Sequence, residues 1–288
     1  MAEHDQKFVL VEQLTRIADA LERTSPPAPK PDNLDYANAY VWHAGMRRLD
    51  PVHNINCVRL DLLRGIDHQR DNLLANSIAF GRGLPANNAL LWGARGTGKS
   101  SLIKAVHASM MESGLDCALV EIHREDIVDL PFLMSFLAQI SRQFILFCDD
   151  LAFDSGETSY KSLKAALEGG IEGRPNNIVF YATSNRRHLM PRQMMENERS
   201  SAINPSETTE ESVSLSDRFG LWIGFHSIDQ DTYLEMIEGY ISHFGINVRN
   251  IDVRHEALSW SVGRGARSGR VAWQFIVDLA ARTETNIN

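Results

Sequence analysis

Short apolar runs alternate with amphipathic segments through the middle of the chain. The runs have the length of buried strands, whereas the segments between them carry apolar residues every three or four positions, as helices do. Five strands are predicted, at residues 89–92, 117–122, 144–148, 178–182 and 221–225. Helices are predicted between them, at 101–106, 131–141 and 160–171. This alternation is typical of an α/β fold with a parallel sheet, which we expect over residues 61–227.

Only helical patterns follow the last predicted strand. They lie at residues 233–244, 254–262 and 269–282 and predict a C-terminal helical lid over 228–288. Before that strand, residues 191–216 are polar and have little hydrophobic period, which predicts a long surface loop.

Residues 1–60 are predicted to form a helical N-terminal extension. A first short helix is indicated by apolar residues at helical spacing, namely Leu10, Leu14, Ile17 and Leu21. A proline-rich linker follows at 25–31. Asp32 can cap a second helix that ends before Pro51 and carries Tyr36, Tyr40, Trp42 and Met46. The extension either packs against the main domain or serves as an arm that docks on a partner.

The composition is that of an ordinary globular protein, with 43% hydrophobic and 23% charged residues among 288. The formal net charge of −8 argues against broad adhesion to nucleic acid but permits a local basic patch. No apolar stretch approaches the roughly 20 residues of a membrane span, so no membrane partner is expected. The acidic N-terminus lacks a signal-peptide core and the three cysteines are scattered, so we expect a cytoplasmic protein with free thiols. No two of the ten histidines are four residues apart, and we expect no protein-held zinc.

A complete phosphate-binding loop follows the first predicted strand of the sheet. It reads Gly93-Ala94-Arg95-Gly96-Thr97-Gly98-Lys99-Ser100, and a helix opens at Ser101. Glycines let backbone N–H groups surround a triphosphate, Lys99 reaches the β and γ oxygens, and the Ser100 hydroxyl can ligate Mg²⁺. The helix N-terminus adds partial positive charge. A glycine-rich structural turn would not require Lys99 and Ser100, so the sequence predicts bound ATP with Mg²⁺.

Two adjacent acids, Asp149 and Asp150, directly follow the strand at 144–148. An acid at the carboxyl end of a buried strand beside such a loop holds the Mg²⁺ shell, usually through water, and we assign this role to Asp149. Many related ATPases carry Glu at the next position, where it orients the attacking water. Asp150 is one methylene shorter, so it can take this role with slower hydrolysis. A helix N-cap would explain only one of the two acids.

Three polar residues further along the chain are candidates for contacting the γ-phosphate. Asn185 follows the strand at 178–182. Taken alone, an Asn there is more often a turn residue, but the acids and the loop upstream favour a residue that contacts the γ-phosphate and the attacking water and so senses the nucleotide state. Arg218 precedes the last strand, where it either reaches the γ-phosphate of a neighbouring subunit or pairs with an acid of its own chain. Arg270 opens the last helix, within the basic segment 263–270. It either contacts phosphate from the lid or belongs to a solvated or DNA-facing turn.

Taken in order, these residues resemble those of an AAA+ ATPase, over about residues 60–283. More narrowly, the chain resembles the bacterial DUF815 family of predicted AAA+ ATPases at residues 63–67, 87–93, 147–151, 181–189 and 216–221. The resemblance implies a core sheet of five parallel strands, an α-helical lid and ATP bound between them.

The resemblance also implies roles for individual residues. Leu63, Gly65 and Ile66 would line the adenine pocket. Asn185 would be the first sensor, Arg218 an arginine finger and Arg270 the second sensor. The departure from the commonest AAA+ pattern is Asp150 in place of Glu, which affects the expected turnover rate rather than ATP binding.

The sequence favours an oligomeric ATPase that binds ATP at a subunit interface and remodels a protein or nucleic-acid partner. The alternative is a nucleotide-gated loader or adaptor with little turnover, which Asp150 and the acidic loop 191–216 suggest. A small-molecule kinase is disfavoured, because the lid lacks an acceptor constellation and the all-helical C-terminus suits AAA+ proteins better. DNA is a candidate partner through residues 186–188 and 264–270, whose charges also lie near the predicted nucleotide.

Overall fold

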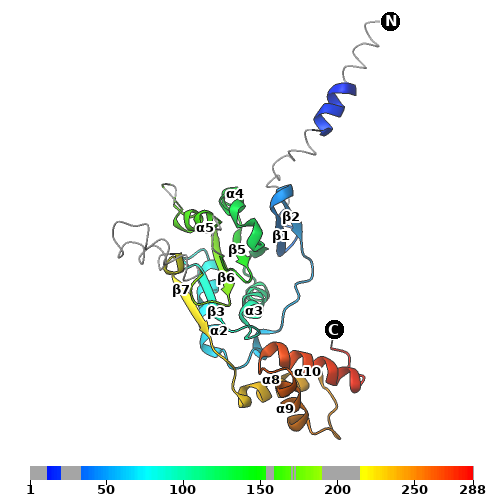
Figure 1. The fold of residues 1–288 in the computed structure, drawn as a ribbon. Helices are drawn as coiled ribbons and strands as arrows, with labels where there is room; N and C mark the ends of the chain where they lie inside the picture. The colour runs from blue at the N-terminus through cyan, green and yellow to red at the C-terminus, as the bar shows by residue number, and fades with distance from the viewer. Residues whose placement is uncertain are drawn as a thin grey trace, which may run out of the picture.

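In the computed structural model, the body of the protein is a seven-stranded sheet with helices on both faces, and a helical lid lies beside it (Figure 1). The structure describes residues 12–20, 34–153, 159–169, 171, 173–189 and 215–287. The strands are β1 (Ala39–His43), β2 (Arg48–Pro51), β3 (Ala89–Gly93), β4 (Cys117–Glu121), β5 (Gln143–Cys148), β6 (Ile178–Ser184) and β7 (Leu221–Phe225). Their order in the sheet is β2-β1-β4-β5-β6-β3-β7.

All five predicted strands are confirmed, and they are parallel to one another in the order β4-β5-β6-β3-β7. Strand β3 lies inside the sheet, between β6 and β7. Because the carboxyl ends of parallel strands meet at one edge, the segments that follow β3, β5 and β6 come together there. The sheet has seven strands rather than five, since β1 and β2 extend it beyond β4.

Each face of the sheet is covered by its own pair of helices. On one face lie α2 (Asp67–Gly81) and α3 (Lys99–Glu112), and on the other α4 (Leu130–Leu137) and α5 (Ser159–Glu168). The 3-10 helix η4 (Arg124–Asp129), which leads directly into α4, also contacts α5. Neighbouring strand residues alternate between the two cores: Leu90 packs with the α4 and α5 side and Leu91 with the α2 and α3 side. Strands buried on both faces read as continuous apolar runs, which explains why the sequence revealed them.

The lid is built from three helices, α8 (Gln230–Phe244), α9 (Val253–Gly263) and α10 (Gly269–Arg282), all at their predicted places. They enclose a third apolar core, which includes Tyr233 and Phe275. Each helix begins at a side-chain cap that accepts a hydrogen bond from a backbone N–H, namely at Asp229, Asp252 and Ser268. The 3-10 helix η3 (Leu60–Leu62) contacts both α3 and α8 and so lies between sheet and lid.

The predicted second helix of the N-terminal extension is wrong. Residues 39–51 form the hairpin of β1 and β2, with the 3-10 helix η2 (Ala44–Met46) at its turn, and β1 pairs with β4 in the main sheet. Tyr40 and Trp42 are two residues apart and both are buried in the same core, which is the period of a strand. Tyr36, taken as part of a helical stripe with them, is exposed.

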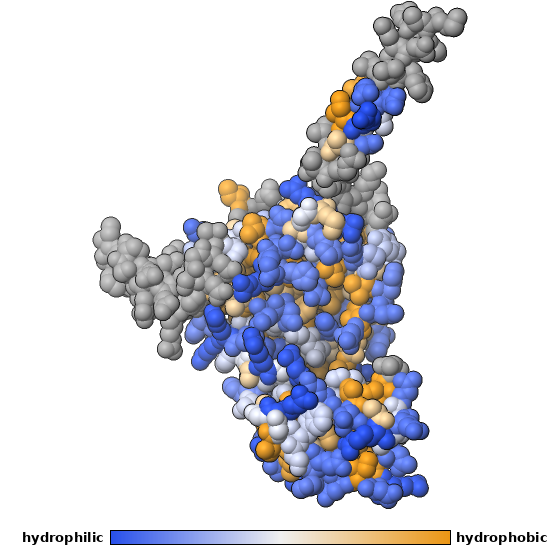
Figure 2. All heavy atoms as spheres, turned by 45° about the vertical axis from the view of Figure 1, so that its right-hand side comes forward, coloured by the Kyte–Doolittle hydropathy of each residue, from blue (hydrophilic) through white to orange (hydrophobic). Residues whose placement is uncertain are grey.

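The first predicted helix is present, since residues 12–20 are helical. Its apolar side chains Leu14 and Ile17 are exposed, and the helix projects away from the body (Figure 2). The predicted linker 25–31 and loop residues 191–214 lie outside the described residues. No described helix is both long enough and apolar enough to span a bilayer.

A buried arginine ties the start of the described body to the sheet. Arg142 lies directly before β5, and its side chain is only 4% exposed. Its guanidinium donates to the carbonyl oxygens of Leu34 (2.6 Å) and Ala37 (2.7 Å), to Oδ1 of Asn38 (3.1 Å) and to Oδ1 of Asp116 (2.8 Å). The segment that leads into β1 is therefore part of the folded body rather than an appendage.

We expect Arg142→Met to destabilise the protein strongly. The substitution keeps the length of the side chain but leaves the carbonyl of Ala37 without the guanidinium donor, at about 1–3 kcal/mol, and leaves the carbonyl of Leu34 with the Tyr40 hydroxyl alone. Urea denaturation would measure the loss. Arg59→Met is the control, because Arg59 forms an exposed ion pair with Asp61 and such pairs contribute about 0–1 kcal/mol. Equal losses in the two variants would contradict the clamp.

Candidate nucleotide-binding site

The predicted phosphate-binding loop connects β3 to α3 and touches both β7 and the lid. Gly93 has φ 142°, and a Cβ there would lie 2.0 Å from the carbonyl oxygen of Phe225 in β7. Gly96 has φ 75°, and a Cβ there would lie 3.0 Å from Oγ of Ser268 and 3.3 Å from Cβ of Arg270. Glycine is required at these positions by the backbone conformation and by the close approach of both neighbours.

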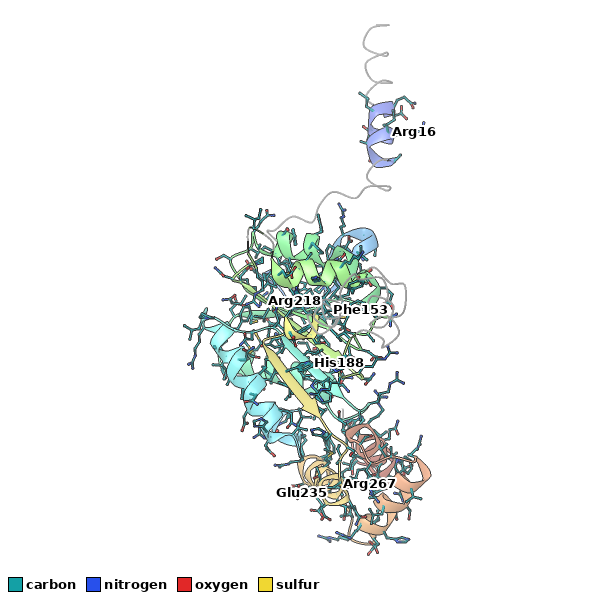
Figure 3. The ribbon with its side chains drawn as sticks, turned by 60° about the vertical axis from the view of Figure 1, so that its left-hand side comes forward. Arg16, Phe153, His188, Arg218, Glu235 and Arg267 are labelled. Carbon is teal, nitrogen blue, oxygen red and sulfur yellow. The ribbon has the colours of Figure 1, made fainter. Side chains whose placement is uncertain are left out.

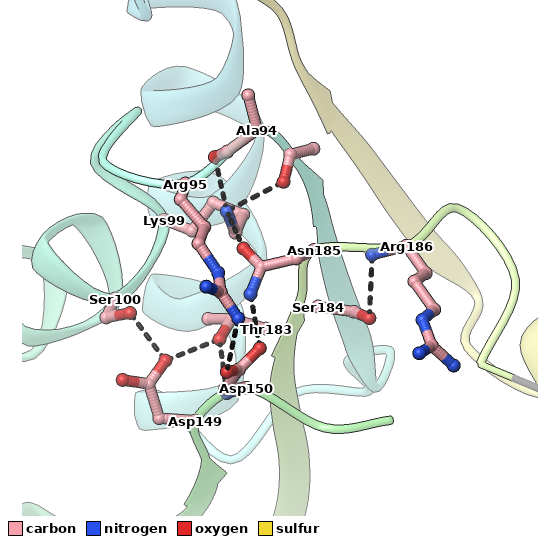
Figure 4. A network of polar contacts seen from close by, with 11 residues as sticks. Ala94, Arg95, Lys99, Ser100, Asp149, Asp150, Thr183, Ser184, Asn185 and Arg186 are labelled. Atoms are coloured by element: carbon pink, nitrogen blue, oxygen red, sulfur yellow. Dashed lines mark hydrogen bonds and ion pairs between the residues drawn. The ribbon is translucent and has the colours of Figure 1, made fainter. Parts of the chain in front are cut away.

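The Lys99 side chain turns into this loop. Its Nζ donates to the carbonyl oxygens of Gly93 (2.9 Å) and Ala94 (2.7 Å), and to Oδ1 of Asn185 (3.2 Å) (Figure 4). Burial lowers the pKa of Lys99, and the carboxylates that follow β5 oppose this shift. The ammonium therefore sits in a partly dehydrated position beside the backbone that would surround a triphosphate.

The two residues predicted to hold Mg²⁺ are in direct contact. Ser100 donates from Oγ to Oδ1 of Asp149 at 2.5 Å, and the same carboxylate oxygen accepts from Oγ1 of Thr183 at 2.5 Å. The described residues include no group of three His, Cys, Asp or Glu side chains that could hold a metal unaided. A hydroxyl and a single carboxylate are nevertheless hard oxygen donors of the kind that Mg²⁺ combines with water and substrate phosphates.

Asp150 adopts a left-handed backbone conformation, with φ 51°. Non-glycine residues rarely do so, although Asp is among the more tolerant. Its N–H donates to Oγ1 of Thr183 (2.9 Å), its Oδ1 accepts from the amide Nδ2 of Asn185, and its Oδ2 lies 3.9 Å from a guanidinium nitrogen of Arg95. The turn thus points the carboxylate across the site rather than away from it.

Asn185 joins the two halves of the site. Its amide oxygen accepts from Lys99 of the loop, and its amide nitrogen donates to Asp150 at the end of β5. One side chain thus contacts both the cation that would meet the phosphate and the acid predicted to position water. The structure brings together Lys99, Ser100, Asp149, Asp150 and Asn185, as expected from strands that end at one edge of a sheet.

The segment predicted to line an adenine pocket lies between the loop and the lid. Leu63 and Ile66 are buried. Gly65 has φ 73°, and a Cβ there would lie 2.3 Å from Cγ2 of Thr232 in α8. On the other side, Ile66 approaches Gly98 of the loop, since a Cβ at Gly98 would lie 3.7 Å from Cδ1 of Ile66.

The two predicted arginines have different surroundings. Arg270, at the start of α10, packs against Gly96, and its charge adds to the burial that lowers the Lys99 pKa. Arg218 instead forms an ion pair with Glu168 at the end of α5. Arg218 precedes β7, which is parallel to β3 and starts level with it. Arg218 therefore lies at the amino ends of these strands, whereas the phosphate-binding loop lies at their carboxyl ends (Figure 3).

Thr183 is a member of the site that the sequence patterns did not indicate. It donates to Asp149 and accepts from the backbone of Asp150, so it holds both acids. A signal was present, because Thr183 and Ser184 place two small hydroxyl side chains at the end of a strand that is buried along its whole length. A buried hydroxyl requires a partner, and the segment after the adjacent strand supplies it.

The sequence matches one family model over most of its length. The model, described as "Protein of unknown function (DUF815)", covers residues 35–283. The match includes the hairpin of β1 and β2 and the whole lid. Among curated proteins, no match is found.

Several solved structures share this arrangement at low sequence identity. Domain III of the replication initiation protein DnaA of Thermotoga maritima has a TM-score of 0.52 at 15% identity, covering 80% of this chain and 91% of that one. The Aeropyrum pernix ORC1 protein in complex with DNA has a TM-score of 0.53 at 16% identity, covering 78% and 64%. A mutant form of Thermotoga maritima RuvB has a TM-score of 0.50 at 19% identity, covering 80% and 69%. At these identities the matches show a common fold.

We expect Gly93→Ala to destabilise the protein much more than Gly114→Ala. Both glycines have positive φ, 142° and 76°, but nothing lies within 4 Å of a Cβ at Gly114. The control therefore carries backbone strain alone, about 1–2 kcal/mol. Gly93→Ala must in addition displace β7, which thermal unfolding without nucleotide would detect. Similar midpoints for the two variants would show that the loop does not depend on β7.

Proposed function

The chain belongs to the DUF815 family, and we propose that it is an AAA+ P-loop ATPase, which binds ATP with Mg²⁺ and hydrolyses it to ADP and phosphate. The observation that carries this proposal is the bridge made by Asn185, which contacts Lys99 and Asp150 at once. A glycine-rich turn of purely structural use would not gather a lysine, two acids and an amide at one strand edge.

Binding is proposed to use the loop 93–100 for the phosphates and residues 63–66 for the base. Lys99 exchanges its contacts with the Gly93 and Ala94 carbonyls for phosphate oxygens, which are better partners for a partly dehydrated ammonium. Ser100 would ligate the metal and Asp149 would hold its water shell. The ion, when bound, supplies charge that neutralises the β- and γ-phosphate oxygens.

Hydrolysis is proposed to use Asp150 and Asn185. The Asp150 carboxylate accepts a hydrogen bond from the attacking water and takes its proton as the oxygen bonds to the γ-phosphorus; the bond from that phosphorus to the β–γ bridging oxygen breaks, and ADP leaves. Asn185 orients the same water and keeps Lys99 in line with it. The carboxylate of Asp150 reaches less far than that of Glu would, so we propose slow turnover. Arg270 contacts phosphate from the lid, which couples the nucleotide to lid position.

The site is proposed to be completed by a second copy of the chain. Arg218 lies across the sheet from its own loop, and an arginine placed there can serve only the site of a neighbour. We therefore propose a homo-oligomer with ATP at the subunit interface, acting in the cytoplasm on a protein client or on DNA. The fold-level match to ORC1, a protein solved with DNA, keeps DNA among the candidates.

A second candidate function is a nucleotide-gated loader or adaptor with little turnover. Two observations favour it. Asp150 is already bonded to Asn185, and Arg218 is already paired with Glu168. Both groups must exchange these partners before hydrolysis. Tight ATP binding without phosphate release, at any protein concentration, would select this alternative.

We expect Lys99→Ala and Asp150→Asn to separate binding from hydrolysis. Lys99→Ala removes the phosphate contact, and calorimetry should show at least a roughly tenfold loss of ATP affinity. Asp150→Asn keeps an oxygen that can accept the hydrogen bond from Asn185 but removes the basic carboxylate. ATP affinity should therefore persist, while phosphate release falls about 10²-fold or more. Asp278→Asn, an exposed acid of α10, is the charge-matched control and should change neither. Unchanged affinity in Lys99→Ala would refute the nucleotide site.

Arg218→Ala and Glu168→Gln should have opposite consequences if Arg218 acts in the neighbouring subunit. Arg218→Ala removes transition-state charge, and kcat should fall by about 10³-fold with little change in ATP affinity. Glu168→Gln removes the charge that pairs with the arginine and should retain or raise kcat. The rate per subunit should also rise with protein concentration as the oligomer forms. Equal loss of stability in both variants, with a concentration-independent rate, would instead establish an intrachain ion pair.

A further inference from the structure

Two residues beyond Asn185, an arginine lies over two tryptophan rings. The guanidinium carbon of Arg187 is 5.2 Å from the ring centroid of Trp92 and 5.7 Å from that of Trp222. The two indole rings are themselves 6.2 Å apart. Both cation distances fall within the roughly 6 Å over which an aromatic face attracts a guanidinium.

The two rings belong to the strands that flank the phosphate loop. Trp92 immediately precedes Gly93, the first residue of the loop, and Trp222 lies in β7. Two histidines extend the cluster: His188 is edge-on to Trp222 at 6.0 Å and His226 is edge-on to Trp92 at 6.3 Å. The cluster therefore connects β3 and β7 to the segment that follows β6.

The segment 185–189 is held at other points as well. The N–H of Arg186 donates to Oγ of Ser184, and the carbonyl of Leu189 accepts from the N–H of Phe153. Leu189 is buried, so it fixes the far end of the segment. Between these two points, Arg187 joins the segment to β3 and β7 through Trp92 and Trp222.

The side chain of Arg187 is exposed and fills no core, so packing density does not account for its place. Its contacts with the two rings tie down the backbone two residues after Asn185. That amide must meet Lys99 on one side and Asp150 on the other, which leaves little freedom for the backbone that carries it. A planar guanidinium can lie over an indole face, whereas an ammonium makes a less directional contact.

We infer that Arg187 is a positioning residue, which holds Asn185 in register with the phosphate loop through its cation–π contacts with Trp92 and Trp222. This inference rests on the proposed ATPase function. It adds a mechanical link, because loss of the γ-phosphate contact at Asn185 would be transmitted through Arg187 to both indoles. Tryptophan fluorescence should therefore report the state of the nucleotide.

The test compares Arg187→Gln with Arg187→Lys and with Arg82→Gln, a surface arginine at the end of α2. We expect Arg187→Gln to lower kcat roughly 10- to 100-fold, as for a small misplacement of a catalytic group, with ATP affinity within about twofold of wild type. Arg187→Lys should recover part of kcat, and Arg82→Gln should match wild type. The thermal midpoints of all variants should agree.

Fluorescence gives the second measurement. The wild type should show different tryptophan emission with ATP and with ADP, and Arg187→Gln should lose that difference. Trp222→Phe should reduce it while retaining most of kcat, which assigns the signal to the cluster rather than to Trp42, Trp260 or Trp273.

The outcomes separate this inference from the function on which it rests. Wild-type kcat in Arg187→Gln, beside lost affinity in Lys99→Ala, overturns the positioning role and keeps the ATPase. A parallel fall in midpoint, affinity and kcat would show a structural role only and also overturns it. Failure of the wild-type protein to bind ATP would overturn both proposals together.

Discussion

Strand β3 pairs in parallel with β6 on one side and with β7 on the other. The carboxyl ends of three strands therefore meet around the loop that leaves β3, with that of β5 alongside. Gly93 touches the backbone of Phe225 on one side, and Asn185 reaches Lys99 on the other. No loop length or local propensity alone would produce these contacts. They follow from strand order, because only neighbours in the sheet deliver their ends to the same place.

The polar network at this edge is closed within the chain. Lys99 and Thr183 are buried and the two acids are exposed, and the Lys99 ammonium, both carboxylates and the Thr183 hydroxyl each have a partner in the chain. Phosphate and metal would therefore enter by exchange of partners. The left-handed turn at Asp150 carries strain of the kind that persists where surrounding contacts determine the backbone. Those contacts come from Thr183 and Asn185, on the neighbouring strand and directly after it.

Sequence reasoning succeeded where burial leaves a periodic trace. The five parallel strands are covered on both faces and read as apolar runs, and their order along the chain predicted that the polar residues after them would lie close together. It failed at 36–46, where Tyr40 and Trp42 follow a period of two but also fit a looser helical spacing. The sequence could not reveal the hydrogen bonds of Arg142, those of Thr183 or the contact of Arg187 with the two indole rings, because each depends on which segments are adjacent in space. For the same reason, the sequence could not name Glu168, 50 residues away, as the acid that pairs with Arg218.

The polarity of the sheet also constrains any assembly. Lys99 and Asp150 lie at the carboxyl edge of the parallel strands, and Arg218 lies at the amino edge. A two-fold dimer joins identical surfaces, so it brings Arg218 of one copy to the phosphate of the other only where a single interface includes both edges of the sheet. A head-to-tail contact, by contrast, sets the amino edge of one copy against the carboxyl edge of the next. Such contacts repeat, and they close into a ring or continue as a helix. If Arg218 serves a neighbouring site, the polarity of one subunit favours cyclic or helical assemblies, and Glu168 holds the arginine, whose side chain is 21% exposed, at the edge where that neighbour would arrive.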